Sequence, residues 1–140
     1  HRKENEGREI LLNRKGIGPF RVMGEPARLE RVIENLLDNA VSFSPPEGRI
    51  EITVVAHGDT VEARILDQGP GIPAGEREKV FERFHSVRPE AESFGKHSGL
   101  GLAIARTIVE AHDGTLELAD PPGRAKGACF VIALPAAVRP

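Results

Sequence analysis

Apolar side chains recur at intervals of three and four residues in the stretch that begins at Pro26. This spacing predicts an amphipathic α-helix, because residues three and four apart share one face of a helix. Proline suits the first helical turn, and the run "SPPEG" (44–48) is expected to end the helix. The apolar positions of the stripe are Leu29, Val32, Ile33, Leu36, Leu37, Ala40 and Val41.

A second helix is predicted from Gly99 onward, where "GLGLAIARTIVEAHDG" repeats the helical period and Gly114 is expected to form the C-cap. The charged segment "EREKVFERF" (76–84) predicts a short helix with Phe81 and Phe84 on one side. Residues 85–98 lack any period and mix charge with proline, serine and glycine, a composition typical of surface loops that carry function. We expect this segment to be a lid.

Six shorter segments have the composition and alternation of β-strands. Two surround a "GIG" turn, two surround "HGD" and two surround "PPGRAKG", and the last two pairs predict antiparallel hairpins. Helices interleaved with such hairpins indicate an α/β two-layer sandwich, a mixed sheet with helices packed on one face. In chain order the segments are 8–15, 19–24, 49–56, 60–67, 115–120 and 128–135.

Composition narrows the class of protein. The chain has 140 residues, with 39% apolar and 29% charged residues and a formal charge of −2, which fits one soluble domain and gives no sign of a nucleic-acid or membrane surface. No apolar run approaches the roughly 20 residues of a membrane span. The single Cys129 excludes an internal disulfide, and a cytosolic setting fits. The chain opens at His1 rather than Met, and we expect it to be a fragment of a longer protein.

Asn35 and Asn39 lie one turn apart inside the first predicted helix, although asparagine is a mediocre helix former. Both could face solvent or bond back to the helix. Alternatively, an amide oxygen could ligate a hard cation such as Mg²⁺, which keeps most of its waters and takes few protein ligands.

Two glycine-containing segments add candidate chemistry. "DQGPGI" places Asp67 at a strand end before Gly69 and Gly71; it is either a turn with a solvated carboxylate or a carboxylate that accepts a hydrogen bond from an amine such as that of adenine. "GLGL" (99–102) opens a helix, whose free N–H groups can hold phosphate. The second segment is neither a Walker A motif nor a dinucleotide fingerprint.

In their order along residues 21–135, these segments resemble the N, G1, F and G2 boxes of sensor histidine kinases. The resemblance implies the Bergerat ATP-binding fold, with a largely antiparallel mixed sheet, that is shared with gyrase, mismatch-repair and chaperone ATPases and with anti-sigma-factor kinases. Residues 85–112 are most similar to the ChvG-type envelope sensors of alphaproteobacteria.

The resemblance also implies roles for individual residues. Asn39 would be a Mg²⁺ ligand and catalytic, Asn35 a second polar contact on the metal or phosphate side, and Asp67 the anchor of adenine. Phe43 would lie beside the nucleotide, and Arg83 and the lid residues Lys96 and His97 would reach the γ-phosphate. The loop against the base would contain Gly69, Gly71 and Ile72, and the phosphate cradle Gly99, Leu100, Gly101 and Leu102.

Two departures from related families bear on the chemistry. Many sensor kinases carry lysine where this chain has Ser42, so that Lys96, Arg83 or Arg88 would have to supply charge to the phosphates. Relatives that hydrolyse ATP carry a glutamate base at the position of Asn35, and Glu34 lies about 140° away from Asn39 around the helix. Hydrolysis is therefore disfavoured and phosphoryl transfer to a histidine favoured.

The acceptor histidine is expected outside this chain, because His112-Asp113 matches only the first two residues of the family's acceptor motif. The resemblance implies a histidine protein kinase domain that uses ATP and Mg²⁺, with a dimerisation and acceptor domain in the same protein, a homodimeric full-length protein and a downstream response regulator. It implies the cytoplasmic part of an inner-membrane sensor. A nucleotide-binding regulatory module or degenerate kinase, and an anti-sigma-factor-type serine kinase, stay open as alternatives.

Overall fold

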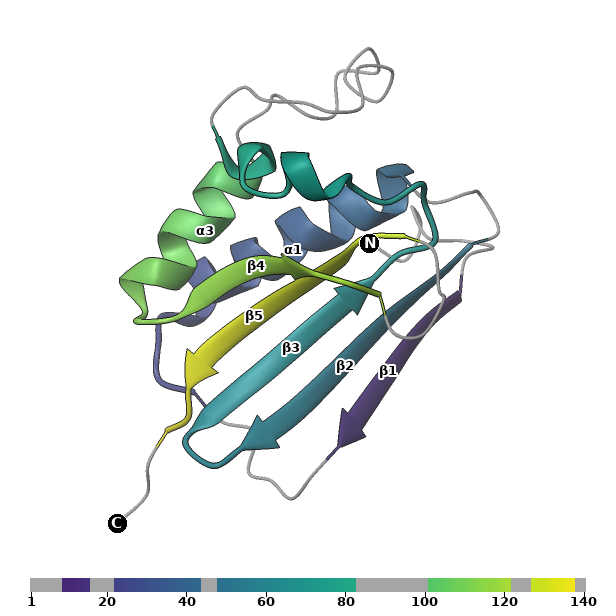
Figure 1. Ribbon diagram of the computed structural model, residues 1–140. Helices are drawn as coiled ribbons and strands as arrows, with labels where there is room; N and C mark the ends of the chain where they lie inside the picture. The colour runs from purple at the N-terminus through teal and green to yellow at the C-terminus, as the bar shows by residue number, and fades with distance from the viewer. Residues whose placement is uncertain (1–8, 16–21, 44–47, 83–100, 122–126, 138–140) are drawn as a thin grey trace.

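The computed structural model describes residues 9–15, 22–43, 48–82, 101–121 and 127–137. Five strands within these ranges form one sheet in the order β1-β2-β3-β5-β4 (Figure 1). Strand β1 pairs with β2 in parallel, and the other neighbours are antiparallel. The sheet is therefore mixed and largely antiparallel, as predicted. The strands are β1 (Glu9–Lys15), β2 (Arg49–His57), β3 (Thr60–Leu66), β4 (Thr115–Ala119) and β5 (Cys129–Pro135).

The helices α1 (Pro26–Phe43) and α3 (Gly101–Ala111) lie on the same side of this sheet (Figure 1). Their apolar stripes meet the inward residues of the strands in one core, which confirms the two-layer fold class. The helical period thus gave the correct buried face except at Ile33, which is 36% exposed, because burial of that face is what holds an amphipathic helix in place. Fully buried core residues are Val32, Leu36, Ile50, Ile65, Ala105, Val109, Leu116 and Phe130.

The helix predicted for residues 76–84 is wrong. The chain instead forms two 3₁₀ turns, η1 (Ala74–Glu76) and η2 (Lys79–Phe81), and residues 83 and 84 lie outside the described ranges. A helix this short is marginal by itself, so its shape follows the tertiary contacts of its side chains. Here Val80 and Phe81 are both buried, which fixes the tighter turn.

The strand predicted for residues 19–24 is also not observed in its described part. Val22 makes only an isolated bridge with Ala136. The preceding strand β1 instead pairs along its whole length with β2, from Glu9 opposite Arg49 to Lys15 opposite Val55. The neighbour of β1 in the sheet is therefore β2, which lies further along the chain, and not the adjacent segment 19–24.

The end of α3 also differs from the prediction. Asp113, not Gly114, takes the left-handed conformation, with φ of 64°. The N–H of Asp113 donates to the carbonyl of Glu110 and that of Gly114 to the carbonyl of Val109, each at 3.0 Å, which is a Schellman ending. Gly114 is required for another reason, because a Cβ there would collide with the carbonyl oxygen of Ala133 in β5.

Candidate functional site

Asp67 follows β3 directly and is only 1% exposed. Its Oδ1 accepts hydrogen bonds from the N–H of Gly69 at 2.9 Å and from the N–H of Ala128 at 3.0 Å. Its Oδ2 is buried and has no hydrogen-bond partner within the described part of the chain. A buried carboxylate oxygen without a donor is costly. This geometry excludes the solvated turn residue and leaves one oxygen open to a donor from a ligand.

The backbone around Asp67 is closely packed. The N–H of Asp67 donates to the carbonyl of Ala128 at 3.1 Å, so that the loop is joined to the start of β5. Gly127 has φ of 118°, and a Cβ there would overlap the carbonyl oxygen of Asp67. Gly71 has φ of 83° and would place a Cβ 3.2 Å from the carbonyl oxygen of Gly127. Glycine is thus required at both positions.

Gly127 and Ala128 were missed in the sequence analysis. Ala128 lies 61 residues from Asp67, and no local pattern relates the two. The only available signal was the glycine immediately before the final predicted strand, since glycine at a strand end often marks a close approach of backbones.

The predicted metal-side residues lie on α1. Asn39 is only 7% exposed and therefore does not face solvent. None of the described residues makes a hydrogen bond to its amide. Asn35 is half-buried, and its Nδ2 donates to the carbonyl of Gly101 at 3.1 Å. That bond joins α1 to the first turn of α3 and brings Asn35 to Gly101, the described start of the predicted phosphate cradle. The amide oxygen of Asn35 is the atom left for a ligand.

We expect Asn35→Ala to lower the free energy of unfolding by about 1 kcal/mol. The substitution removes the bond to Gly101 and leaves its carbonyl unpaired, which outweighs the better helix propensity of alanine. Thermal denaturation followed by circular dichroism measures the effect. Asn39→Ala is the matched control, because the described residues offer it no hydrogen bond to lose; equal stability of the two variants would mean that the Asn35 bond contributes nothing.

Several predicted site residues lie outside the described residues or are described only in part. Gly101 and Leu102 form the first turn of α3, and Leu102 packs against the core, so that its backbone rather than its side chain is available to a ligand. Ile72 also packs against the core, next to the loop that holds Asp67. The lid 85–98 and the side chain of Phe43 lie outside the described part, as do Arg83, Arg88, Lys96, His97, Gly99 and Leu100.

Arg106 joins α3 to η2, the two elements on either side of residues 83–100. Its Nη1 donates to Glu78 at 3.1 Å, and its guanidinium carbon lies 4.4 Å from the centroid of the Phe81 ring. Phe81 in turn meets the buried Phe130 of β5 edge-on, with the ring centroids 6.1 Å apart. A cation above an aromatic ring is attractive. This stack therefore fixes η2 against α3 and the sheet.

His112 is engaged at both ring nitrogens. Nδ1 lies 2.8 Å from the carbonyl of Ile108, and Nε2 accepts a hydrogen bond from the N–H of Glu25 at 3.2 Å. A neutral ring with its proton on Nδ1 satisfies both contacts. The ring thus joins the C-terminal end of α3 to the N-terminal end of α1, which is a structural role.

Cys129 lies opposite Leu66 in the β3–β5 pairing. Leu66 is the residue immediately before Asp67 in the sequence. It is buried, and this burial raises the pKa of its thiol above the ordinary value. Among the described residues, no group of three or more His, Cys, Asp or Glu side chains could hold a metal ion. No helix in the described part of the chain is long and apolar enough to cross a membrane.

Comparisons with known proteins agree with this geometry. Residues 24–138 match the family described as histidine kinase-, DNA gyrase B-, and HSP90-like ATPase. The sensor protein ChvG of Rhizobium meliloti (strain 1021) is 45% identical over 125 residues, which cover 86% of this chain and 22% of that protein. The signal transduction histidine-protein kinase/phosphatase MprB of Mycobacterium sp. (strain KMS) is 44% identical over 120 residues, or 83% of this chain and 23% of that protein.

Solved structures are similar over nearly the whole chain. A mycobacterial sensor histidine kinase MprB superposes with a TM-score of 0.82 and 37% identity, covering 96% of this chain and 85% of that one. Full-length ShkA in complex with AMPPNP superposes with a TM-score of 0.80 and 26% identity, covering 98% of this chain and 28% of that one. The chain therefore spans only a small part of the full-length proteins that it matches.

Proposed function

Since the chain belongs to the family of histidine kinase-, DNA gyrase B- and HSP90-like ATPases, we propose that it binds Mg-ATP and donates the γ-phosphoryl group to a histidine on a separate dimerisation and acceptor domain. All 140 residues would form one catalytic ATP-binding domain with residues 85–98 as its lid. The observation that carries this proposal is the buried carboxylate of Asp67, with one oxygen held by two backbone N–H groups and the other without a donor in the described chain.

Adenine fits this carboxylate because its exocyclic amine is a donor, whereas guanine presents a carbonyl oxygen at the same position. The loop beside Asp67 is closely packed through Gly71 and Gly127, so the base would lie against backbone and Ile72. The AMPPNP bound in ShkA, a structure of the same fold, is an adenine nucleotide and supports this assignment.

The phosphate side of the proposed site lies where α1 meets the first turn of α3. The amide oxygen of Asn39 suits Mg²⁺, a hard cation that takes few protein ligands. When bound, the metal would neutralise charge on the phosphates. Asn35 would contact the same side through its oxygen, and the first turn of α3 would offer backbone N–H groups to phosphate. The remaining proposed contacts are Phe43, Arg83, Lys96, His97, Gly99, Leu100, Gly101 and Leu102.

Transfer, rather than hydrolysis, is the proposed reaction. Asn35 stands where hydrolysing relatives carry a basic carboxylate, and a neutral amide is too weak a base to accept a proton from water. In the proposed step, an imidazole nitrogen forms a bond to the γ-phosphorus while the bond from phosphorus to the β,γ-bridging oxygen breaks, and ADP leaves. The chain would supply positioning and electrostatic stabilisation.

The wider setting is proposed from the relatives. ChvG is named a sensor protein and MprB a signal transduction histidine-protein kinase/phosphatase, and the chain spans 22% and 23% of them. We propose that this domain belongs to a homodimeric inner-membrane sensor, lies on its cytoplasmic side, and acts in a two-component system with a response regulator.

The proposal predicts that the isolated chain binds γ-labelled ATP but acquires no acid-labile phosphate. His112 is the nearest match to an acceptor motif, and both of its ring nitrogens are engaged. Adding a separate acceptor domain, taken from a close relative, should give label on that domain. Phosphohistidine on this chain would contradict the assignment of the acceptor, and ATP binding without labelling of any acceptor would favour the regulatory module.

A further inference from the structure

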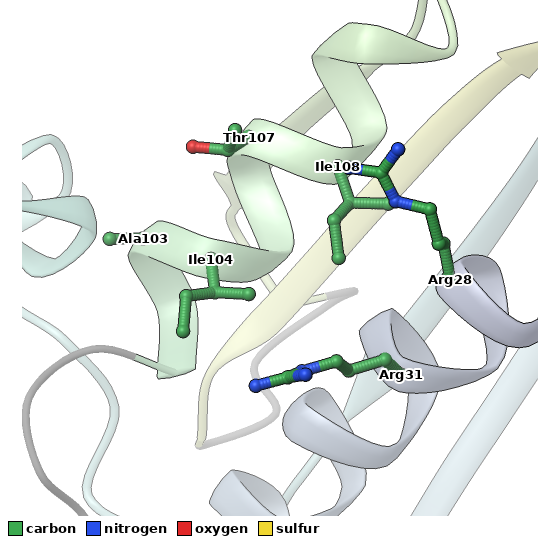
Figure 2. Close-up of a pocket in the computed structure, with 6 residues that line it drawn as sticks. All are labelled: Arg28, Arg31, Ala103, Ile104, Thr107 and Ile108. Carbon is green, nitrogen blue, oxygen red and sulfur yellow. The ribbon is translucent and has the colours of Figure 1, made fainter.

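A groove of about 540 Å³ runs between α1 and α3, and it contains none of the residues assigned above to the nucleotide (Figure 2). Its apolar wall comes from α3, and Figure 2 shows two arginine side chains reaching toward it from α1. Thr107 is exposed and also lines the groove, with its hydroxyl turned away from the two arginines in Figure 2. The lining residues are Arg28, Arg31, Ala103, Ile104, Thr107 and Ile108.

The groove is held open between two fixed points. At one end the Asn35 amide donates to the carbonyl of Gly101. At the other end the N–H of Glu25 donates to the ring of His112. Three turns of α3, about 16 Å of helix, lie between these two bonds. The helices are therefore fixed at both ends of the groove, and a ligand would meet a preformed surface.

The two arginines lack counterions in the described part of the chain. Arg28 and Arg31 are exposed and make no hydrogen bond or ion pair with any described residue. By contrast, three other arginines of the described chain form ion pairs with carboxylates. No described acidic side chain lines the groove. Those paired arginines are Arg64 with Glu62, Arg77 with Asp120, and Arg106 with Glu78.

Spacing and charge together define what fits. Residues three apart on a helix lie about 5–6 Å apart, so Arg28 and Arg31 match two carboxylates that are themselves one helical turn apart. The half-buried Ile104 offers apolar contact beside them, whereas Ile108 lies at the bottom of the groove and is only 5% exposed. A groove with apolar anchors and charged edges is a common way to bind an amphipathic helix.

We propose that this groove binds an acidic amphipathic helix of a partner protein. Its apolar residues would pack against Ile104, and its carboxylates would pair with Arg28 and Arg31. A membrane surface fits less well, because recognition of anionic lipid typically uses clusters of four to eight basic residues. The net charge of −2 also disfavours a nucleic acid. The inference does not depend on ATP binding.

The test uses the whole chain and a synthetic peptide helix that carries leucines at i and i+4 and glutamates one turn apart beside them. A matched peptide has glutamine in place of each glutamate. Fluorescence anisotropy should give saturable binding of the glutamate peptide, with a Kd below about 1 mM, and binding at least about tenfold weaker for the glutamine peptide. Affinity should fall as salt is raised.

Variants locate the binding. R28A/R31A should weaken the glutamate peptide by about tenfold, and Thr107→Glu, which adds a carboxylate to the lining, should weaken it as well. Arg64→Ala and Arg77→Ala, on other faces, are the matched controls and should change nothing. Circular dichroism confirms that each variant is folded.

Three outcomes would overturn the proposal: no binding of either peptide, equal binding of both peptides, or equal binding by the groove variants and the parent chain. Vesicles of phosphatidylglycerol and phosphatidylcholine form a further arm. Binding to such vesicles that R28A/R31A abolishes, with no preference for the glutamate peptide, would assign the groove to anionic lipid instead.

Discussion

The Asp67→Asn variant is expected to bind ATP at least about tenfold more weakly than the parent chain and to lose most of the preference for ATP over GTP. The orientation of the new amide is fixed by its surroundings. Two N–H groups, from Gly69 and Ala128, point at the position of Oδ1 and require an acceptor there. The amide must therefore place its oxygen at Oδ1 and its NH₂ at Oδ2.

That arrangement reverses the recognition at the open position. A donor at Oδ2 would face the donor of adenine's exocyclic amine and leave both unpaired, whereas the carbonyl oxygen of guanine could accept from it. An unpaired buried polar group costs about 1–3 kcal/mol, or roughly fivefold to more than a hundredfold in affinity. Discrimination should therefore narrow or reverse.

Calorimetric titration of ATP and GTP against both chains measures this effect. Asp120→Asn is the matched control, since that carboxylate is 85% exposed and pairs only with Arg77 among the described residues. The nucleotide-free Asp67→Asn variant should be no less stable than the parent, because it keeps both backbone bonds and removes an unpaired charge. An unchanged preference for ATP over GTP in Asp67→Asn would mean that Asp67 stabilises its loop but does not recognise the base.

Asn39→Ala should abolish most of the magnesium-dependent part of ATP affinity. We expect a loss of at least about tenfold in the presence of Mg²⁺ and a much smaller loss in EDTA, because the amide oxygen acts through the metal. Alanine favours the helix, so the fold should persist.

Binding of ATP with and without Mg²⁺ is the measurement for Asn39→Ala, and Asn35→Ala is the comparison. Asn35 donates to Gly101 and so affects the first turn of α3 whether or not metal is present. If Asn39→Ala weakened ATP binding equally in Mg²⁺ and in EDTA, the substitution would have damaged α1 rather than removed a metal ligand.

Much of the fold could be predicted from local pattern. The stripe in α1 and the "HGD" hairpin depend on residues close together in sequence, and both are as predicted. The pairing of β1 with β2 could not be predicted, since it joins segments forty residues apart, from Glu9 with Arg49 onward. The 3₁₀ turns at 74–81 could not be predicted either, because packing against residues distant in the sequence sets their shape.

The candidate site divides in the same way. Asp67 could be identified from "DQGPGI", but the two facts that give it chemical meaning, its burial and its bond from Ala128, depend on the register of β3 with β5. Likewise, the sequence suggested a ligand role for Asn35, whereas the direction of its amide nitrogen depends on how α3 packs against α1.

Cys129 gives this chain a built-in probe of local opening. The only thiol in the sequence lies in the β3–β5 pairing beside Asp67, and its burial and raised pKa protect it from alkylation while the strands stay paired. Its alkylation rate therefore reports how often this part of the sheet separates. A nucleotide held by Asp67 should slow that reaction, so that ligand protection can be followed by mass spectrometry without any engineered label.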